Sequence, residues 1–213
     1  MEKGIVIQLQ EEAIKEDVDI ETLLRKAYLV ARKLQLKKFE NWVLNEQNGY
    51  KGALPEYRNV GGELQAFNPY RGWIPVMANG KMADFLDTMP INMPIAAISE
   101  AYSGSDGTIA LTIPGEFTDF LNKNSASFDT KFRYKTSKTE FKKIISAVRN
   151  KILEWALLLE ENGIVGEGLV FTDDEKKTAK NSSVINNYTN NFYSTAEHTQ
   201  IQQGADAKTV SNE

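Results

Sequence analysis

Residues 137–163 read SKTEFKKIISAVRNKILEWALLLEENG, the longest regular hydrophobic pattern in the chain. Ser137 and Glu140 have the S-x-x-E spacing of a capping box, which marks the start of a helix. The apolar residues behind them recur at helical spacing: Phe141, Ile144, Ile145, Val148, Ile152, Trp155, Ala156 and Leu159. Asn162 and Gly163 are residues that stop helices. The stretch therefore predicts a helix of roughly 25 residues that is the spine of the fold.

Three shorter helices are expected in the first 50 residues. The first is predicted from the apolar residues Ile5, Val6, Leu9 and Ala13. Asp19 is the expected N-cap of the second. Its apolar positions are Leu23, Leu24, Ala27, Val30, Ala31 and Leu34. The third contains Phe39, Trp42 and Val43 and ends at Asn48–Gly49. Such stripes are typical of helices that bury one face in a core.

The middle of the chain has a different composition. All 6 prolines lie between Pro55 and Pro114, and 9 of the 14 glycines lie between Gly49 and Gly115. Short strand-like runs occur at Tyr57–Phe67, Trp73–Met77, Thr108–Ile113 and Phe128–Tyr134, and short helices are expected at 85–86, 95–102 and 116–121. We predict an α+β fold in which the N-terminal helices and the long C-terminal spine helix pack with a small, loop-rich sheet.

The composition changes again after the long helix. We expect a globular domain over 1–162, a linker with a short charged helix over 163–182, and an Asn-rich, polar, β-prone tail over 183–213. Polar segments with interspersed apolar residues favour β self-association when several copies meet. The tail is therefore a candidate oligomerisation segment, with the apolar residues Val184, Ile185, Tyr188, Phe192, Tyr193 and Ile201.

Several kinds of chemistry have no basis in the sequence. There is no cysteine, and His198 is the single histidine, so thiolate nucleophiles, Cys–His pairs and His-rich metal sites are excluded. Phosphate-binding loops of the GxxxxGK[ST] or GxGxxG kind do not occur. We assign no catalytic residue, metal or cofactor. With no signal-peptide pattern and no apolar run long enough for a membrane span, a cytoplasmic protein without a membrane partner is expected.

Basic residues gather before and within the spine helix. From Lys131 to Lys151 there are eight basic residues against Glu140 alone; the segment carries +7 and, with −4 overall, the remainder carries −11. Lys131, Arg133 and Lys135 alternate with aromatic residues and are expected to share one strand face. A solvated surface is one interpretation of this segment. The other is an anion or nucleic-acid patch made of Lys131, Arg133, Lys135, Lys142, Lys143 and Arg149.

A second unusual cluster reads NPYRGWIP over residues 68–75. Tyr70, Arg71 and Trp73 are residue types that are enriched in binding hot spots, so they form a candidate interaction surface. A proline-braced aromatic loop that fills the core is an equally good interpretation.

Four long blocks of the sequence resemble the AbiTii family, small proteins associated with bacterial abortive-infection defence against phage. The blocks are LLRKAYLVARKL (23–34), FENWVLNEQNGY (39–50), LPEYRNVGGELQAFNPYRGWIPV (54–76) and AVRNKILEWALLLEENGIVGEG (147–168). The resemblance covers about residues 1–170. It implies a cytoplasmic role in which infection triggers growth arrest or death of the host cell, and it carries over no catalytic residue.

Three hypotheses of mechanism follow. The preferred one is a self-assembling, non-enzymatic defence component whose partner is itself, through the tail, with a phage or host protein as a further partner. The alternative is a nucleic-acid- or nucleotide-binding effector that uses the basic patch. The third is a toxin enzyme with an Asp/Glu/Arg/Tyr site, for which the residues available are Glu56, Tyr57, Arg58, Tyr70 and Arg71.

Overall fold

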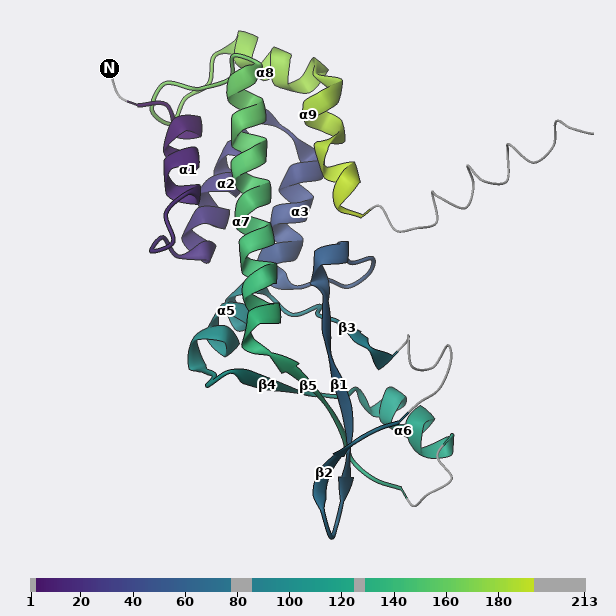
Figure 1. Ribbon diagram of the computed structural model, residues 1–213. Coiled ribbons are helices and arrows are strands. Elements are labelled where there is room, and N and C mark those ends of the chain that lie inside the picture. The colour runs from purple at the N-terminus through teal and green to yellow at the C-terminus, as the bar shows by residue number, and fades with distance from the viewer. Residues whose placement is uncertain (1–2, 78–85, 125–128, 194–213) are drawn as a thin grey trace, which may run out of the picture. The chain divides into compact units, whose positions relative to one another are not determined.

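A computed structural model describes residues 3–77, 86–124 and 129–193 (Figure 1). The α+β prediction is confirmed, because the chain combines helices with one small antiparallel sheet. The chain divides into two compact units. We call them the helical unit, drawn from residues 1–56 and 149–213, and the sheet unit, residues 57–148.

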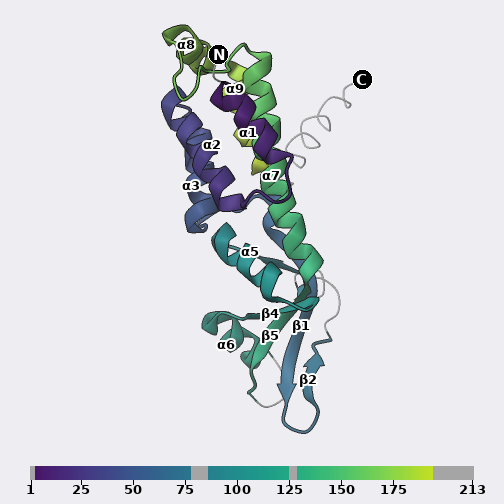
Figure 2. The same ribbon diagram turned by 90° about the vertical axis from the view of Figure 1, so that its left-hand side faces the viewer.

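The helical unit contains the described helices of both chain ends. These are α1 (Ile5–Ala13), α2 (Ile20–Leu34), α3 (Lys37–Asn48), residues 149–161 of α7 (Lys138–Glu161), α8 (Asp173–Asn181), α9 (Ser183–Asn187) and the 3-10 helix η2 (Tyr188–Phe192). The apolar stripes expected for this unit are buried. The Phe39 ring stacks on Trp155 with centroids 3.7 Å apart, so α3 and α7 pack side by side (Figure 2).

Side-chain caps fix where two of these helices begin. The Asp19 carboxylate accepts a hydrogen bond from the Thr22 amide at 2.9 Å, as predicted for an N-cap. Thr172 and Glu175 form a reciprocal capping box at the start of α8. Both caps satisfy amides that have no partner within the helix.

The segment 183–193 differs from its expected β-prone character, because α9 and η2 are helical. Ile185, Thr189 and Phe192 are buried, and Phe192 makes an edge contact with Trp42 at 5.2 Å. With Tyr188, these residues have the i, i+3, i+4, i+7 spacing of a helix that docks on a core. The asparagines between them masked that spacing in the sequence. Ile201 and His198 lie outside the described residues.

The sheet unit contains five strands. In chain order they are β1 (Asn59–Asn68), β2 (Gly72–Pro75), β3 (Thr88–Pro90), β4 (Thr108–Thr112) and β5 (Phe132–Ser137). The order β2-β1-β5-β4 is antiparallel throughout, and β3 pairs with the start of β1. Helices α5 (Ile95–Gly104) and α6 (Gly115–Lys123) and the short η1 (Glu56–Arg58) flank the strands. Strand β3 was not expected, because three residues that end in proline give no periodicity.

The pairing register divides the sheet into two faces. Paired residues of antiparallel strands point to the same side, so Leu64, Tyr134 and Leu111 share one face. We call this the inner face, since Leu64 and Tyr134 are buried. The outer face carries Glu63, Gln65 and Phe67 of β1, Trp73 of β2, Ala110 and Thr112 of β4, Arg133 and Lys135 of β5, and Lys131 just before β5.

Two further observations concern membrane-spanning helices and metal sites. None of the helices in the described residues is long and apolar enough to cross a membrane. Within the same part of the chain, no three His, Cys, Asp or Glu residues come together in a way that would hold a metal ion.

Candidate functional site

A tryptophan and an arginine meet on the outer face of the sheet. The Arg133 guanidinium lies 4.4 Å from the Trp73 ring centroid, and its Nε donates to Gln65 Oε1 at 2.8 Å. The Phe67 ring meets the edge of Trp73 at 5.4 Å. These contacts hold Trp73 and Arg133 in one orientation, which is the pre-organisation that a stacking surface needs.

Two hollows border this cluster. One, of about 510 Å³, is lined by Phe67, Pro69, Trp73, Asp129, Thr130 and Lys131. The other, of about 400 Å³, lies over β4 and is lined by Trp73, Ala110, Leu111, Thr112, Ile113, Thr118, Lys131, Phe132 and Arg133. Both volumes fall in the usual range of ligand sites. Trp73 and Lys131 line both hollows.

Small side chains on β4 keep the second hollow open. Ala110 pairs with Lys135 and Thr112 pairs with Arg133, so short residues stand beside long cationic ones on the same face. Larger residues at these positions would fill the space beside Trp73.

The cations of the outer face pair with no carboxylate in the part of the chain that the structure describes. Among the described residues, Lys131, Arg133 and Lys135 form no ion pair, and Arg133 is bonded to the neutral amide of Gln65. Their charge is therefore not neutralised by contact, which is the condition for binding an anion. We call the cluster Phe67, Trp73, Lys131 and Arg133 the aromatic end of the outer face.

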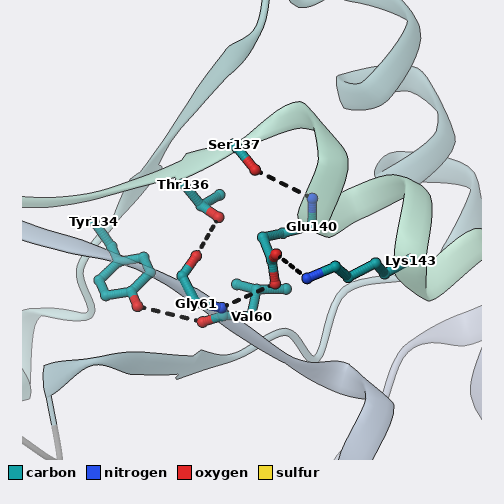
Figure 3. Close-up of polar contacts among 7 residues, drawn as sticks. All are labelled: Val60, Gly61, Tyr134, Thr136, Ser137, Glu140 and Lys143. Atoms are coloured by element: carbon teal, nitrogen blue, oxygen red, sulfur yellow. Dashed lines mark hydrogen bonds and ion pairs between the residues drawn. The ribbon is translucent and has the colours of Figure 1, made fainter.

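The other end of the same face is polar (Figure 3). A hollow of about 310 Å³ there is lined by Gly61, Gly62, Glu63, Thr108, Lys135, Thr136, Ser137 and Glu140. Two carboxylates, Glu63 and Glu140, stand in it beside Lys135. The hydrogen bond from Lys143 holds the pKa of Glu140 below its ordinary value, so this carboxylate carries a negative charge at neutral pH. This end therefore has two carboxylates beside one lysine, whereas the first hollow of the aromatic end has one carboxylate, Asp129, beside Lys131, and the second hollow has Lys131 and Arg133 without a carboxylate among its described lining residues.

Only half of the predicted capping box forms at this end. The Glu140 amide donates to Ser137 Oγ at 3.4 Å, as the box requires. The Glu140 carboxylate instead accepts from the Gly61 amide of β1 at 3.2 Å and pairs with Lys143 (Figure 3). A strand donor thus replaces the local one, which spacing along the helix does not reveal.

The NPYRGWIP cluster forms the turn between β1 and β2. Asn68 Oδ1 accepts from the amides of Tyr70 and Arg71 at 2.9 and 3.1 Å, and this closes the hairpin. Tyr70 is 96% exposed, so the cluster is not a core plug. Tyr70 and Arg71 lie at the hairpin tip, and Trp73 lies on the outer face.

The predicted basic patch divides into parts with different roles. Lys131, Arg133 and Lys135 share the outer face, as expected. Lys142 is exposed on α7, and Lys143 is paired with Glu140.

Arg149 belongs to the helical unit instead. It donates to the carbonyl oxygens of Lys15 and Val18 at 2.8 and 2.6 Å, and burial lowers its pKa. Its guanidinium thus closes the loop after α1. Arg149 was predicted to belong to an anion patch because a count of charges along the sequence does not reveal hydrogen bonds from a guanidinium to backbone carbonyl oxygens.

A larger cavity, of about 670 Å³, lies on the inner face of the sheet. None of the described residues that line it is charged. The Tyr134 hydroxyl there donates to the Asp87 carbonyl oxygen at 2.7 Å, and burial raises its pKa to about 12. The inner cavity therefore offers volume without a charged group among its described lining residues, whereas the aromatic end offers charge and a stacking surface.

The residues considered for an enzyme site do not come together. Arg58 is fully buried, and its Nη1 donates to the Met93 carbonyl oxygen at 2.8 Å. Arg58 and Arg71 lie at opposite ends of β1, whose length is roughly 30 Å for ten residues. Arg58 therefore has a structural role.

Comparison with protein-family models identifies the chain. The AbiTii model matches residues 4–184, which include the whole sheet unit and most of the helical unit. The chain belongs to the AbiTii family. Membership supports an abortive-infection role in phage defence. No curated protein and no solved structure matches the chain. The outer face lies inside the part that matches the AbiTii model, and η2 lies beyond it.

Two residues of the site were missed in the sequence. Phe67 and Gln65 alternate with Leu64 and Ala66 along β1, and this period of two was the available signal. It shows that Gln65 and Phe67 share a face. It does not show that Arg133 and Trp73 come from the two neighbouring strands to meet them.

Proposed function

We propose that this AbiTii protein acts in phage defence as a non-enzymatic, cytoplasmic binding protein and that the outer face of its sheet binds nucleic acid. The observation that carries the proposal is the contact between Trp73 and Arg133 beside two open hollows. Unpaired cations supply affinity for phosphate, and aromatic and guanidinium planes supply stacking for bases.

The net charge of the chain limits where nucleic acid could bind. The protein as a whole is acidic, so a general attraction for polyanions is not expected. The proposal therefore confines binding to the outer face, where Lys131, Arg133 and Lys135 form no ion pair with any other described residue.

The test is binding of fluorescently labelled DNA and RNA oligonucleotides to the full chain at low salt, measured by anisotropy. We expect affinity to fall as salt rises, with a log–log slope of roughly −2 to −3 for three phosphate contacts. The double variant Lys131→Gln/Arg133→Gln should bind at least about tenfold more weakly and with a shallower slope. Lys177→Gln, an exposed lysine on α8, is the matched control. If the full chain binds neither DNA nor RNA at low salt, the proposal is wrong.

Self-assembly through the tail is the second candidate function. It is supported by the polar composition of residues 194–213, which contain Gln, Thr and Ser, and by the apolar residue Ile201 among them. Because Ile185 and Phe192 are buried in the same chain, we place the assembling part after residue 193. Light scattering of the full chain beside a 1–193 truncation tests it.

A further inference from the structure

The two hollows of the aromatic end have a shared wall. Trp73 and Lys131 line both of them, and the other lining residues belong to one hollow or the other. Phe67 and Pro69 give the first hollow an apolar side, with Asp129 and Thr130 as its polar groups, and Arg133 stands in the second. A ligand that fills both hollows therefore has two parts, and Trp73 and Lys131 lie at the boundary between those parts.

A dinucleotide step of a single strand has this form. Its two bases are flat and apolar on their faces, and one phosphate joins the two nucleosides. We propose that the aromatic end binds single-stranded nucleic acid with one base in each hollow, Trp73 between the bases and Lys131 on the phosphate that joins them. The proposal rests on the proposed function and names the form of nucleic acid that this face binds.

The separation of the two hollows favours bases that are not paired. Bases in a duplex are stacked on each other and turned inward, so they cannot enter separate hollows unless the duplex opens. Single strands present unstacked bases to aromatic rings and guanidinium planes. The Arg133 plane over Trp73 extends the stacking surface into the second hollow.

The burial of the three tryptophans makes tryptophan fluorescence a direct measure of ligand stacking on Trp73. Trp42 is 1% exposed and Trp155 is fully buried, whereas Trp73 is partly exposed on the outer face. A base that stacks on Trp73 therefore changes the fluorescence of the one tryptophan that a ligand reaches. Phosphate has no ring that could stack on Trp73, so a polyphosphate without bases is the control for the effect of charge alone.

The experiment titrates the full chain with oligothymidylate and oligouridylate of roughly ten nucleotides, the size range of single-strand sites. A duplex of matched length and inorganic polyphosphate are the two other probes. We expect both single strands to quench tryptophan fluorescence, the duplex to bind at least about tenfold more weakly, and polyphosphate to bind without quenching.

Variants separate stacking from charge. Trp73→Leu should weaken single-strand binding, measured by anisotropy, by about tenfold or more, and Trp73→Phe should restore most of it. Lys131→Gln should reduce the salt slope by roughly 0.7, the share of one phosphate on a single strand. Circular dichroism of each variant checks the fold, and Lys177→Gln again serves as the control.

The possible failures are distinguishable. Equal binding of duplex and single strand, or binding without quenching, overturns the single-strand placement and leaves nucleic-acid binding intact. Quenching by polyphosphate would also overturn it, because no base is then required. Absence of binding by every oligonucleotide overturns the proposed function itself.

Discussion

At the scale of single residues, Gly62 determines how closely β1 approaches β5. A Cβ atom at this position would lie 2.5 Å from the Lys135 carbonyl oxygen and 2.5 Å from a ring carbon of Tyr134. The ring cannot move away freely, since the Tyr134 hydroxyl is bonded to the Asp87 carbonyl oxygen. The approach that sets β5 beside β1 therefore requires glycine.

We expect Gly62→Ala to lower the free energy of unfolding by about 1–3 kcal/mol, the usual cost of overpacking. Urea unfolding monitored by circular dichroism measures the change. Gly104→Ala is the matched control, because a Cβ at Gly104 meets nothing within 4 Å. Equal stability of the two variants would contradict the role assigned to Gly62.

At the scale of elements, Glu140 joins the start of α7 to β1. Its carboxylate accepts from the Gly61 amide, while Thr136 of β5 donates to the Gly61 carbonyl oxygen at 2.6 Å. The strand residue Gly61 is thus held by both β5 and α7 (Figure 3). These bonds fix the polar end of the outer face.

The pKa of Glu140 is lowered chiefly by its hydrogen bond with Lys143 and further by the Gly61 amide, against the opposing effect of burial. A carboxylate whose pKa is lower in the folded state stabilises the fold above its unfolded pKa, and that stabilisation is lost as pH falls. We expect stability to fall as pH drops below about 4.5 and Glu140→Gln to flatten this dependence. Urea unfolding between about pH 3 and 7 measures it, with the exposed Glu116→Gln as control. An unchanged pH profile would show that the contacts of Glu140 with Lys143 and Gly61 contribute nothing to the pH dependence of stability.

At the scale of the whole molecule, the order of segments matters for any assembly experiment. The segment 183–193 contributes buried residues to the helical unit, and Tyr188 donates to the Glu154 carboxylate at 2.8 Å. A truncation before this segment would expose Trp42 and confuse loss of folding with loss of assembly.

We therefore expect a 1–193 truncation to unfold at the same urea concentration as the full chain. If the tail assembles copies, light scattering should show an oligomer for the full chain and a monomer for 1–193. The same mass for both chains would exclude the tail as the assembling element. Phe192→Ala in the full chain is the control for docking, and it should lower stability by roughly 3–5 kcal/mol without changing the mass.

Much of the fold follows from local pattern. The stripe of 137–163 gave α7, the Asp19 cap gave the start of α2, and the runs 57–67, 73–77 and 108–113 largely coincide with β1, β2 and β4. The alternation of Lys131, Arg133 and Lys135 with aromatic residues correctly placed them on one face. These features depend on residues within a few positions of each other, where period and capping chemistry act directly.

The tertiary structure alone decided which distant residues meet. Trp73 and Arg133 are 60 positions apart, and both reach Phe67 and Gln65 only because β1 lies between β2 and β5. Arg149 does not belong to the basic patch, because its guanidinium donates to backbone carbonyl oxygens of residues that are over 130 positions away in the sequence. Strand order and hydrogen bonds between residues far apart in the sequence leave no period in it. The sequence therefore indicated the residue types of the outer face, and the strand order brought them together.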